Sequence, residues 1–66
     1  MEKYHICLCI WGEKGEEIMS TNDIRHATEE ARDLQRILSQ EKKDEGYYYG
    51  VFERGFSAPI YKPIGY

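Results

Sequence analysis

The chain has 66 residues and a formal net charge of −3, from twelve acidic and nine basic side chains. This length allows one domain, residues 1–66, and a chain so short buries only ~60% of the surface that its unfolded form exposes. The acidic balance argues against a protein that works mainly by neutralising phosphates, because such binding depends on a surplus of basic side chains.

The N-terminus and the cysteines favour the cytoplasm. Met1 and Glu2 lead straight into an alternating segment, which predicts no signal peptide, and no apolar run approaches the ~20 residues of a membrane span. Cys7 and Cys9 stand one residue apart, whereas a small secreted domain normally carries more cysteines at wider spacing. We therefore expect a cytoplasmic protein.

The N-terminal segment predicts a β-hairpin. Residues 3–11, KYHICLCIW, are rich in β-branched, aromatic and large apolar side chains, as strands are. Gly12 and Gly15 mark a turn, because glycine adopts positive φ without steric cost. Residues 16–20, EEIMS, are expected to return as a short second strand.

The central segment predicts one amphipathic helix, with Thr21 or Asn22 as its N-cap. A mainly apolar stripe recurs at three- and four-residue spacing: Ile24, Ala27, Thr28, Ala31, Leu34, Ile37 and Leu38. An alternative boundary has Thr28 as the cap and shortens the helix by nearly two turns, but the stripe already begins at Ile24. The polar residues 40–46 are expected to end the helix.

The C-terminal segment predicts a second β-hairpin. Residues 47–53 form the expected third strand, Arg54 and Gly55 a tight turn, and residues 56–62 a fourth strand. Pro59 lacks an amide hydrogen, so the fourth strand is expected at an edge of the sheet.

A two-residue turn fixes the register of this hairpin and pairs Val51 with Ala58 and Tyr48 with Tyr61. The element order is then β-β-α-β-β. We expect a single α+β domain in which one helix packs on one face of a short antiparallel sheet.

One helix covers only one face of a sheet, so the other face needs a separate explanation. Ile6, Leu8, Ile10 and Val51 belong to the larger apolar face, which is expected beneath the helix. The opposite face carries mostly aromatic and thiol side chains: His5, Cys7, Cys9, Trp11, Tyr48, Phe52 and Tyr61. Exposed apolar patches usually mark interaction sites, and Tyr and Trp dominate binding hot spots.

We predict a binding surface of five side chains from this face: Trp11, Tyr48, Phe52, Tyr61 and His5. Its occupant is either a different macromolecule or a second copy of the chain, packed sheet against sheet in a symmetric homodimer. A register slip of one residue would exchange the two faces. Base stacking is less favoured, because Lys3, Arg54 and Lys62 are the only basic residues on or beside these strands.

The sequence predicts neither a metal site nor an enzyme. His5, Cys7 and Cys9 are types that bind zinc, but alternate residues on a strand stand ~6.6 Å apart and no second cluster supplies a fourth ligand. A Cys7–Cys9 disulfide would distort the strand, so free thiols are expected. A cysteine paired with His5 or His26 lacks a third orienting residue, and no phosphate-binding glycine pattern is present. No cofactor is expected.

The whole layout resembles a class of small inhibitors. A strand KYHICLCIW, a glycine turn, a helix TNDIRHATEEARDLQRIL and a closing hairpin YYYGVFERGFSAPIY together span most of the chain. In length and order they resemble the small α+β proteins, anti-CRISPR proteins among them, that phages and mobile elements encode against host machinery. The resemblance assigns no functional residue. It implies a non-enzymatic, stoichiometric inhibitor that docks on a host protein or nucleoprotein complex. The alternative is a homodimeric regulatory or nucleic-acid-binding module.

Overall fold

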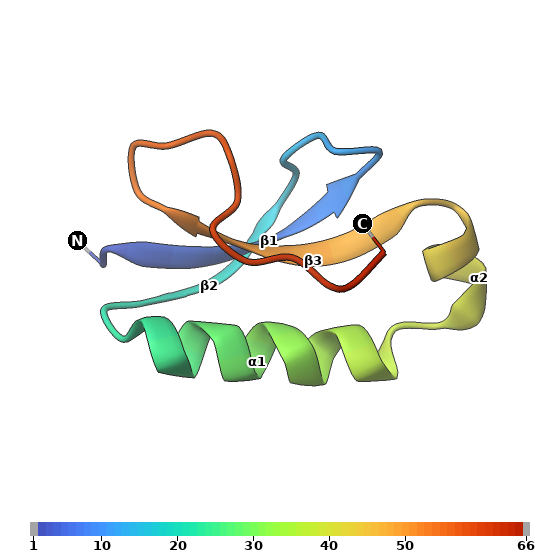
Figure 1. Cartoon of the computed structure of the whole chain (residues 1–66), viewed down its shortest axis with the longest axis horizontal. Coiled ribbons are helices and arrows are strands. Elements are labelled where there is room, and N and C mark those ends of the chain that lie inside the picture. The colour runs from blue at the N-terminus through green and yellow to red at the C-terminus, as the bar shows by residue number, and fades with distance from the viewer. Residues whose placement is uncertain (1, 66) are drawn as a thin grey trace.

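A computed structural model describes residues 2–65 and shows a small antiparallel sheet with a helix along one face (Figure 1). The elements are β1 (Tyr4–Ile10), β2 (Glu17–Thr21), α1 (Ile24–Ile37), α2 (Gln40–Asp44) and β3 (Tyr47–Glu53). The sheet has three strands in the order β2-β1-β3. The predicted α+β class is confirmed, with the element order β-β-α-α-β among the described residues.

The first strand is the centre of the sheet. It pairs with β3 along its whole length, from Tyr4 opposite Glu53 to Ile10 opposite Tyr47. Because side chains alternate along a strand, β1 contributes to a core on each side of the sheet. A strand buried on both faces reads as a nearly continuous apolar run, and that is the pattern of residues 4–10.

An irregularity in β2 changes which side chain faces the sheet's reverse side. Ile6 lies opposite Met19, but Cys7 lies opposite Glu17, so Ile18 is the extra residue of a β-bulge. The bulge leaves the side chain of Ile18 exposed. It also brings the Glu17 carboxylate to the face of the sheet opposite α1, beside His5.

Helix α1 begins one or two residues later than predicted. Asp23 is the N-cap, and its carboxylate accepts from the backbone N–H of Arg25 at 3.0 Å. The predicted caps have other roles: Thr21 Oγ1 accepts from Asp23 N at 3.2 Å, and Asn22 Oδ1 accepts from Lys3 N at 2.9 Å. The cap prediction was wrong by one or two residues, because these two side chains fasten the helix start to the sheet.

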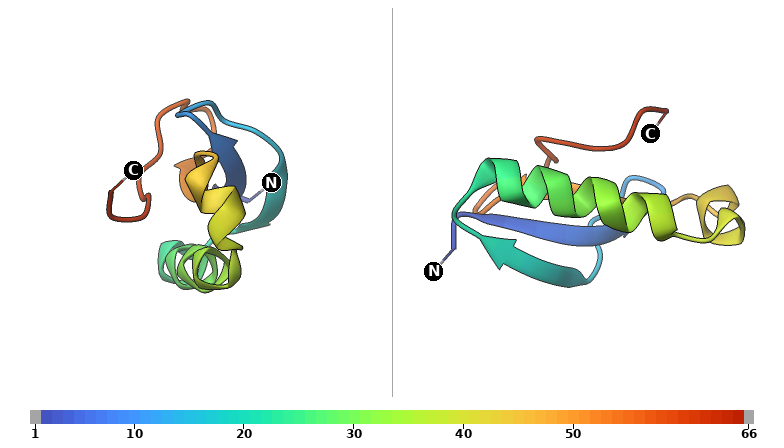
Figure 2. Two further views of the ribbon diagram at one scale, coloured as in Figure 1. Left: turned by 90° about the vertical axis from the view of Figure 1, so that its right-hand side faces the viewer. Right: turned by 90° about the horizontal axis from the view of Figure 1, so that it is seen from below.

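The helix packs on the sheet through small side chains. Ala27 and Ala31 are fully buried against Ile6 and Val51, with Leu34 and Tyr49 packed at the margin. The predicted apolar stripe is correct in its middle, but its ends at Ile24 and Ile37 are exposed. Two further views show α1 running along one face of the sheet (Figure 2).

A second short helix, α2, forms within the polar residues 40–46, which were expected only to end the first helix. Ser39 is its N-cap and accepts from Lys42 N at 3.2 Å, and Gly46, with φ 100°, follows its end. All five of its residues are polar, so no hydrophobic period marks it in the sequence. The signals that indicate it are the capping serine and the glycine beyond its end.

The predicted fourth strand is wrong. The turn at Arg54 and Gly55 forms, with Phe56 N donating to Glu53 O at 3.0 Å, but residues 56–60 then leave the sheet as a loop. The chain returns only at an isolated bridge of Val51 with Tyr61, where Val51 N donates to Tyr61 O at 3.0 Å. The predicted pairs Val51–Ala58 and Tyr48–Tyr61 are therefore wrong.

A physical cause of this departure is Pro59. Proline has no N–H for the ladder and restricts the conformation of the residue before it, so it disfavours a regular strand through residues 56–62. The C-terminal segment runs along β3 after Tyr61 and ends beside the α2 end of the sheet (Figure 1).

Candidate binding site

The reverse face of the sheet is buried, which corrects the prediction of an uncovered aromatic face. Cys7, Cys9, Tyr48 and Phe52 form a second core cluster, and His5 beside them is only 4% exposed. Two loops, residues 11–16 and 54–60, rise on the side of the sheet opposite α1 (Figure 1). Four of the five predicted binding residues are therefore not available as an open surface for a sheet-against-sheet dimer.

Contacts from both loops explain this cover. Lys14 Nζ lies 4.8 Å from the centre of the Phe52 ring. A Cβ placed on Gly15 would lie 2.3 Å from the Leu8 carbonyl oxygen, so that loop passes directly over the β1 backbone. From the other loop, Pro59 Cβ lies 3.6 Å from a Cβ built on Gly50. Loops can thus shield a sheet face that no helix reaches.

The five predicted binding residues have three different fates. Phe52 and His5 lie inside the second core cluster or beside it, and Tyr61 packs at the margin of the core beneath α1, on the face opposite to the one predicted. Tyr48 is 5% exposed but lines a pocket, and Trp11, also on that pocket, is 77% exposed. Of the five, only Trp11 and Tyr48 line the pocket, while His5 and Phe52 stack on each other in the core.

Trp11 lies in a strained turn. Ile10 and Glu13 exchange two backbone hydrogen bonds of 3.1 and 2.9 Å, which leaves Trp11 and Gly12 as a two-residue hairpin loop. Their φ angles are 53° and 83°, the pattern of a type I′ turn that favours Asn, Asp and Gly. A side chain with a Cβ costs about 1–2 kcal/mol in this conformation. Such strain is commonly retained where the side chain has a function.

The indole is fixed by Gly46. Trp11 N donates to Gly46 O at 3.3 Å. A Cβ built on Gly46 would lie 3.0 Å from Trp11 Cε2 and 3.1 Å from Cδ2, so the ring rests on the bare α-carbon. One side of the ring is therefore packed on backbone, while most of the side chain remains in contact with solvent.

A pocket of about 530 Å³ opens beside this ring. It is lined by residues from the β1–β2 turn, α2, the start of β3 and the C-terminal segment: Trp11, Gly12, Lys43, Asp44, Gly46, Tyr48, Lys62 and Gly65. Its volume lies in the ~300–1,000 Å³ range of small-ligand sites. Lys43 and Asp44 were not predicted as site residues, because their polar segment was expected only to end the helix. No local pattern places residues 62–65 beside residue 11.

The pocket is locally cationic in a chain that is acidic overall. Two lysines, Lys43 and Lys62, face a single carboxylate, Asp44, whose Oδ1 accepts from Gln40 Nε2 at 2.9 Å. Lys42, the neighbour of Lys43 in α2, lies 4.9 Å from the centre of the Tyr47 ring. The pocket lining beside Trp11 thus carries two lysines and one carboxylate, with the Tyr48 ring in the same wall.

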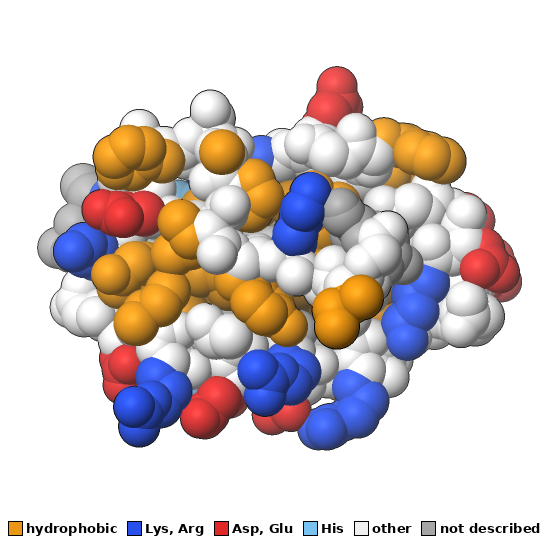
Figure 3. Space-filling view, viewed as in Figure 1, with side chains coloured by type: hydrophobic (Ala, Val, Ile, Leu, Met, Phe, Trp, Pro, Cys, Tyr) orange, Lys and Arg blue, Asp and Glu red, His pale blue; other side chains and the backbone are white. Residues whose placement is uncertain are grey.

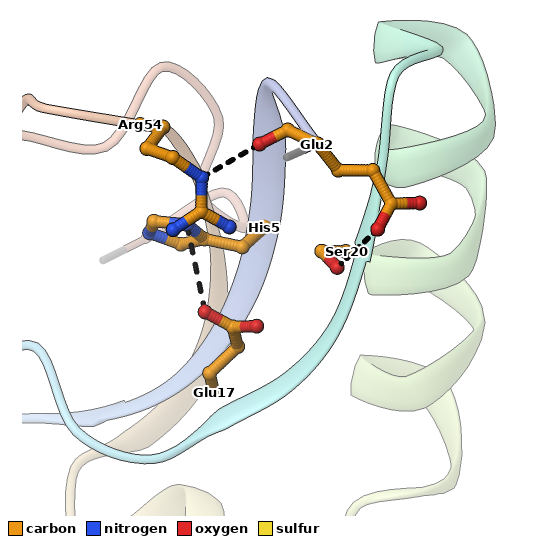
Figure 4. Close-up of polar contacts among 5 residues, drawn as sticks. All are labelled: Glu2, His5, Glu17, Ser20 and Arg54. Atoms are coloured by element: carbon orange, nitrogen blue, oxygen red, sulfur yellow. Dashed lines mark hydrogen bonds and ion pairs between the residues drawn. The ribbon is translucent and has the colours of Figure 1, made fainter.

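His5 is a core side chain with an unusual environment (Figure 4). Its Nδ1 lies 3.7 Å from Glu17 Oε1, and neither ring nitrogen has a hydrogen-bond partner among the described residues. The guanidinium of Arg54, whose Nε donates to Glu2 O at 2.7 Å, lies beside the ring. Burial lowers the pKa of His5, Lys14 and Arg54 lower it further, and Glu17 opposes them.

The two thiols are free and buried. Burial raises the pKa of both Cys7 and Cys9, and Cys9 hydrogen-bonds with the Tyr48 hydroxyl. A thiol with a raised pKa is a poor nucleophile at neutral pH. Among residues 2–65, no group of three or more His, Cys, Asp and Glu side chains is arranged to hold a metal ion.

No helix in the described part of the chain has the length and apolar character needed to cross a bilayer. Comparisons with protein-family models, curated proteins and solved structures found no match for the chain. Function is therefore inferred from the geometry of Trp11 and its surroundings.

Proposed function

We propose that this chain is a small non-enzymatic binding protein that docks on a macromolecular partner, a protein or a nucleoprotein complex, through the end of the sheet where Trp11 lies. Its mode of action is stoichiometric inhibition, in which the bound chain occludes a working surface of the partner. The binding surface consists of Trp11 and the adjoining pocket, not of the sheet face.

The observation that carries this proposal is the geometry of Trp11. A large aromatic side chain occupies a turn position that favours Asn or Gly, rests on a glycine, and stays 77% exposed. Burying it in a partner would recover apolar contact area at little entropic cost, since the ring is already held in place. Tryptophan is among the residues most enriched in binding hot spots.

The state of the nucleophilic groups supports a role without catalysis. Cys7, Cys9 and His5 lie in or beside the second core cluster, and none of them lines the pocket. The raised thiol pKa values and the lowered pKa of His5 keep all three side chains uncharged near neutral pH. Inhibition by occlusion requires none of them to react.

The test is partner capture with turn-preserving variants. Trp11→Asn keeps a residue suited to positive φ, and Phe56→Ala removes another exposed aromatic ring, in the 54–60 loop, as the matched control. Wild type and Phe56→Ala should capture the same partner from the native host, and Trp11→Asn should bind the purified partner at least about tenfold more weakly. Inhibition of that partner should reach its limit at a fixed molar ratio. Equal binding by Trp11→Asn and wild type would refute the proposal.

A second candidate function, self-association, is favoured by the large apolar side chains that are exposed. Residues 2–65 contain seven of them: Trp11, Ile18, Ile24, Ile37, Phe56, Ile60 and Ile64. In the space-filling view, apolar side chains form a band above α1, whose outer side carries charges (Figure 3). Light scattering across a range of protein concentrations distinguishes the two candidates, because self-association raises the mean mass with concentration whereas docking alone does not.

A further inference from the structure

We propose that the pocket beside Trp11 binds a nucleotide, with the base stacked on the indole and the phosphate held by Lys62 and Lys43. This inference rests on the proposed role of the Trp11 end as the binding surface, and it names the chemistry that this surface recognises.

The first element of the argument is the stacking platform. Gly46 supports one side of the indole, and the side chain as a whole is 77% exposed, so a flat ring can approach the other side. Tyr48 forms part of the same wall, and its ring is fixed in the second core cluster. Stacking of a base on such a ring contributes ~1–3 kcal/mol and tolerates any base.

The second element is the set of charged groups. Lys62 is exposed on the pocket and forms no ion pair within residues 2–65, and Lys43 faces the same space from α2. Lysine ammonium groups bind phosphate as compact point charges. The Gln40 hydrogen bond orients the Asp44 carboxylate, which can accept from ribose hydroxyls or from base N–H groups. An aromatic ring, two cations and one carboxylate match the base, the phosphate and the sugar of a nucleotide.

The net charge of −3 limits how many phosphates the chain can bind at once. A chain with so few basic side chains cannot follow a long phosphate backbone, but two lysines can hold one or two phosphates. Each phosphate contact on a single strand changes log K by about −0.7 per unit of log salt concentration. The salt slope is therefore expected to be shallow, about −0.7 to −1.4, whereas a strand-tracking groove gives a steeper one.

Trp11 is the only tryptophan, so its fluorescence reports on the site directly. Titration with adenosine, AMP, UMP and a six-residue oligothymidylate should quench the emission, and the nucleotides should bind more tightly than the nucleoside. Free N-acetyltryptophanamide, titrated in parallel, corrects for light absorbed by the bases. An oligonucleotide that binds at least tenfold more tightly than a mononucleotide identifies an unpaired strand as the source. Equal affinities identify a free nucleotide.

Two lysine variants test the phosphate contact. Lys62→Met should weaken AMP binding several-fold and leave adenosine unchanged, because it removes a cation and keeps the length of the side chain. Lys3→Met is the matched control, since Lys3 is exposed and lies 5.5 Å from the centre of the Tyr4 ring, away from the pocket lining. It should bind AMP as wild type does.

Two results would overturn the inference. One is the absence of saturable quenching with every ligand up to millimolar concentration. The other is equal binding of AMP and adenosine with no effect of Lys62→Met, which would indicate a general aromatic contact. If either occurs while partner capture still depends on Trp11, the nucleotide inference falls and the docking function stands. If Trp11→Asn also leaves partner capture intact, both fall.

Discussion

The indole of Trp11 packs on the α-carbon of Gly46, and a Cβ built on that glycine would lie 3.0 Å from Trp11 Cε2. The pair joins the β1–β2 turn to the end of α2 and holds the ring at the mouth of the pocket. Whatever binds at this end therefore meets a ring whose position is already set.

Gly46→Ala should disturb this contact specifically. The new methyl group would meet Trp11 Cε2 and Cδ2 and would also face the cost of positive φ, about 1 kcal/mol or more. Gly55→Ala is the matched control, because Gly55 has φ 92° and no atom within 4 Å of a Cβ there. We expect Gly46→Ala to shift the Trp11 emission and to be less stable than Gly55→Ala in urea unfolding. Equal stability and unchanged emission would show that the ring does not rest on Gly46.

Trp11→Asn should leave the fold intact and raise its stability. Asparagine tolerates positive φ better than tryptophan, and the 77% exposed indole contributes little buried area, so a gain of up to about 1 kcal/mol is expected. Unfolding in urea measures the gain. A loss of stability larger than about 1 kcal/mol would mean that the indole is a structural side chain, and the functional interpretation of its strain would lose its basis.

Local pattern was enough to predict β1, β3 and the middle of α1. The β-branched, aromatic and large apolar side chains of residues 4–10 and 47–53 and the three- and four-residue spacing from Ala27 to Leu34 are features of neighbouring residues along the chain. It also predicted that Cys7 and Phe52 share a face opposite Ile6 and Val51.

Long-range packing decided the rest. The reverse face of the sheet is covered by Lys14 over the Phe52 ring and by Pro59 beside Gly50, and no periodicity encodes these contacts. The predicted hairpin register was wrong because Pro59 interrupts the ladder. Tyr61 therefore pairs with Val51 and not with Tyr48. The pocket joins Trp11 to Lys62 across the length of the chain, which the sequence alone does not show.

Acid should destabilise the fold through His5. Burial holds the pKa of His5 below the ordinary 6.5. The nearby charges of Lys14 and Arg54 lower it further, and the Glu17 carboxylate opposes the shift only in part. The unfolded chain therefore takes up a proton near pH 6.5 while the folded chain does not, and the free energy of unfolding decreases as pH falls below about 7. One such group gives a slope of at most about 1.4 kcal/mol per pH unit.

Urea unfolding between pH 7.5 and 5 measures this slope. His5→Phe should reduce it, because the neutral ring can still stack on Phe52, where the two rings of the wild type are 5.9 Å apart. His26→Gln should retain it, since His26 is exposed and paired with Glu30 on the surface of α1. An equal slope in His5→Phe and wild type would assign the acid sensitivity to other groups.

Alkali should destabilise the fold through the second core cluster. Burial raises the pKa of Cys7 and Cys9 above the ordinary 9.0, and that of Tyr48 above 10.0. The unfolded chain therefore releases protons first. The contribution of these groups to the free energy of unfolding is constant near neutral pH and decreases as pH rises past about 9. Cys9→Ala should show a smaller decrease between pH 8 and 10 than wild type, although its stability at pH 7 is lower because a cavity forms.

In the wild type, an alkylating reagent at pH 8 should modify the thiols far more slowly in the folded protein than in urea. Equal rates in the two states would mean that loops 11–16 and 54–60 do not shield the sheet, and the burial of Phe52 and His5 would then be in question as well.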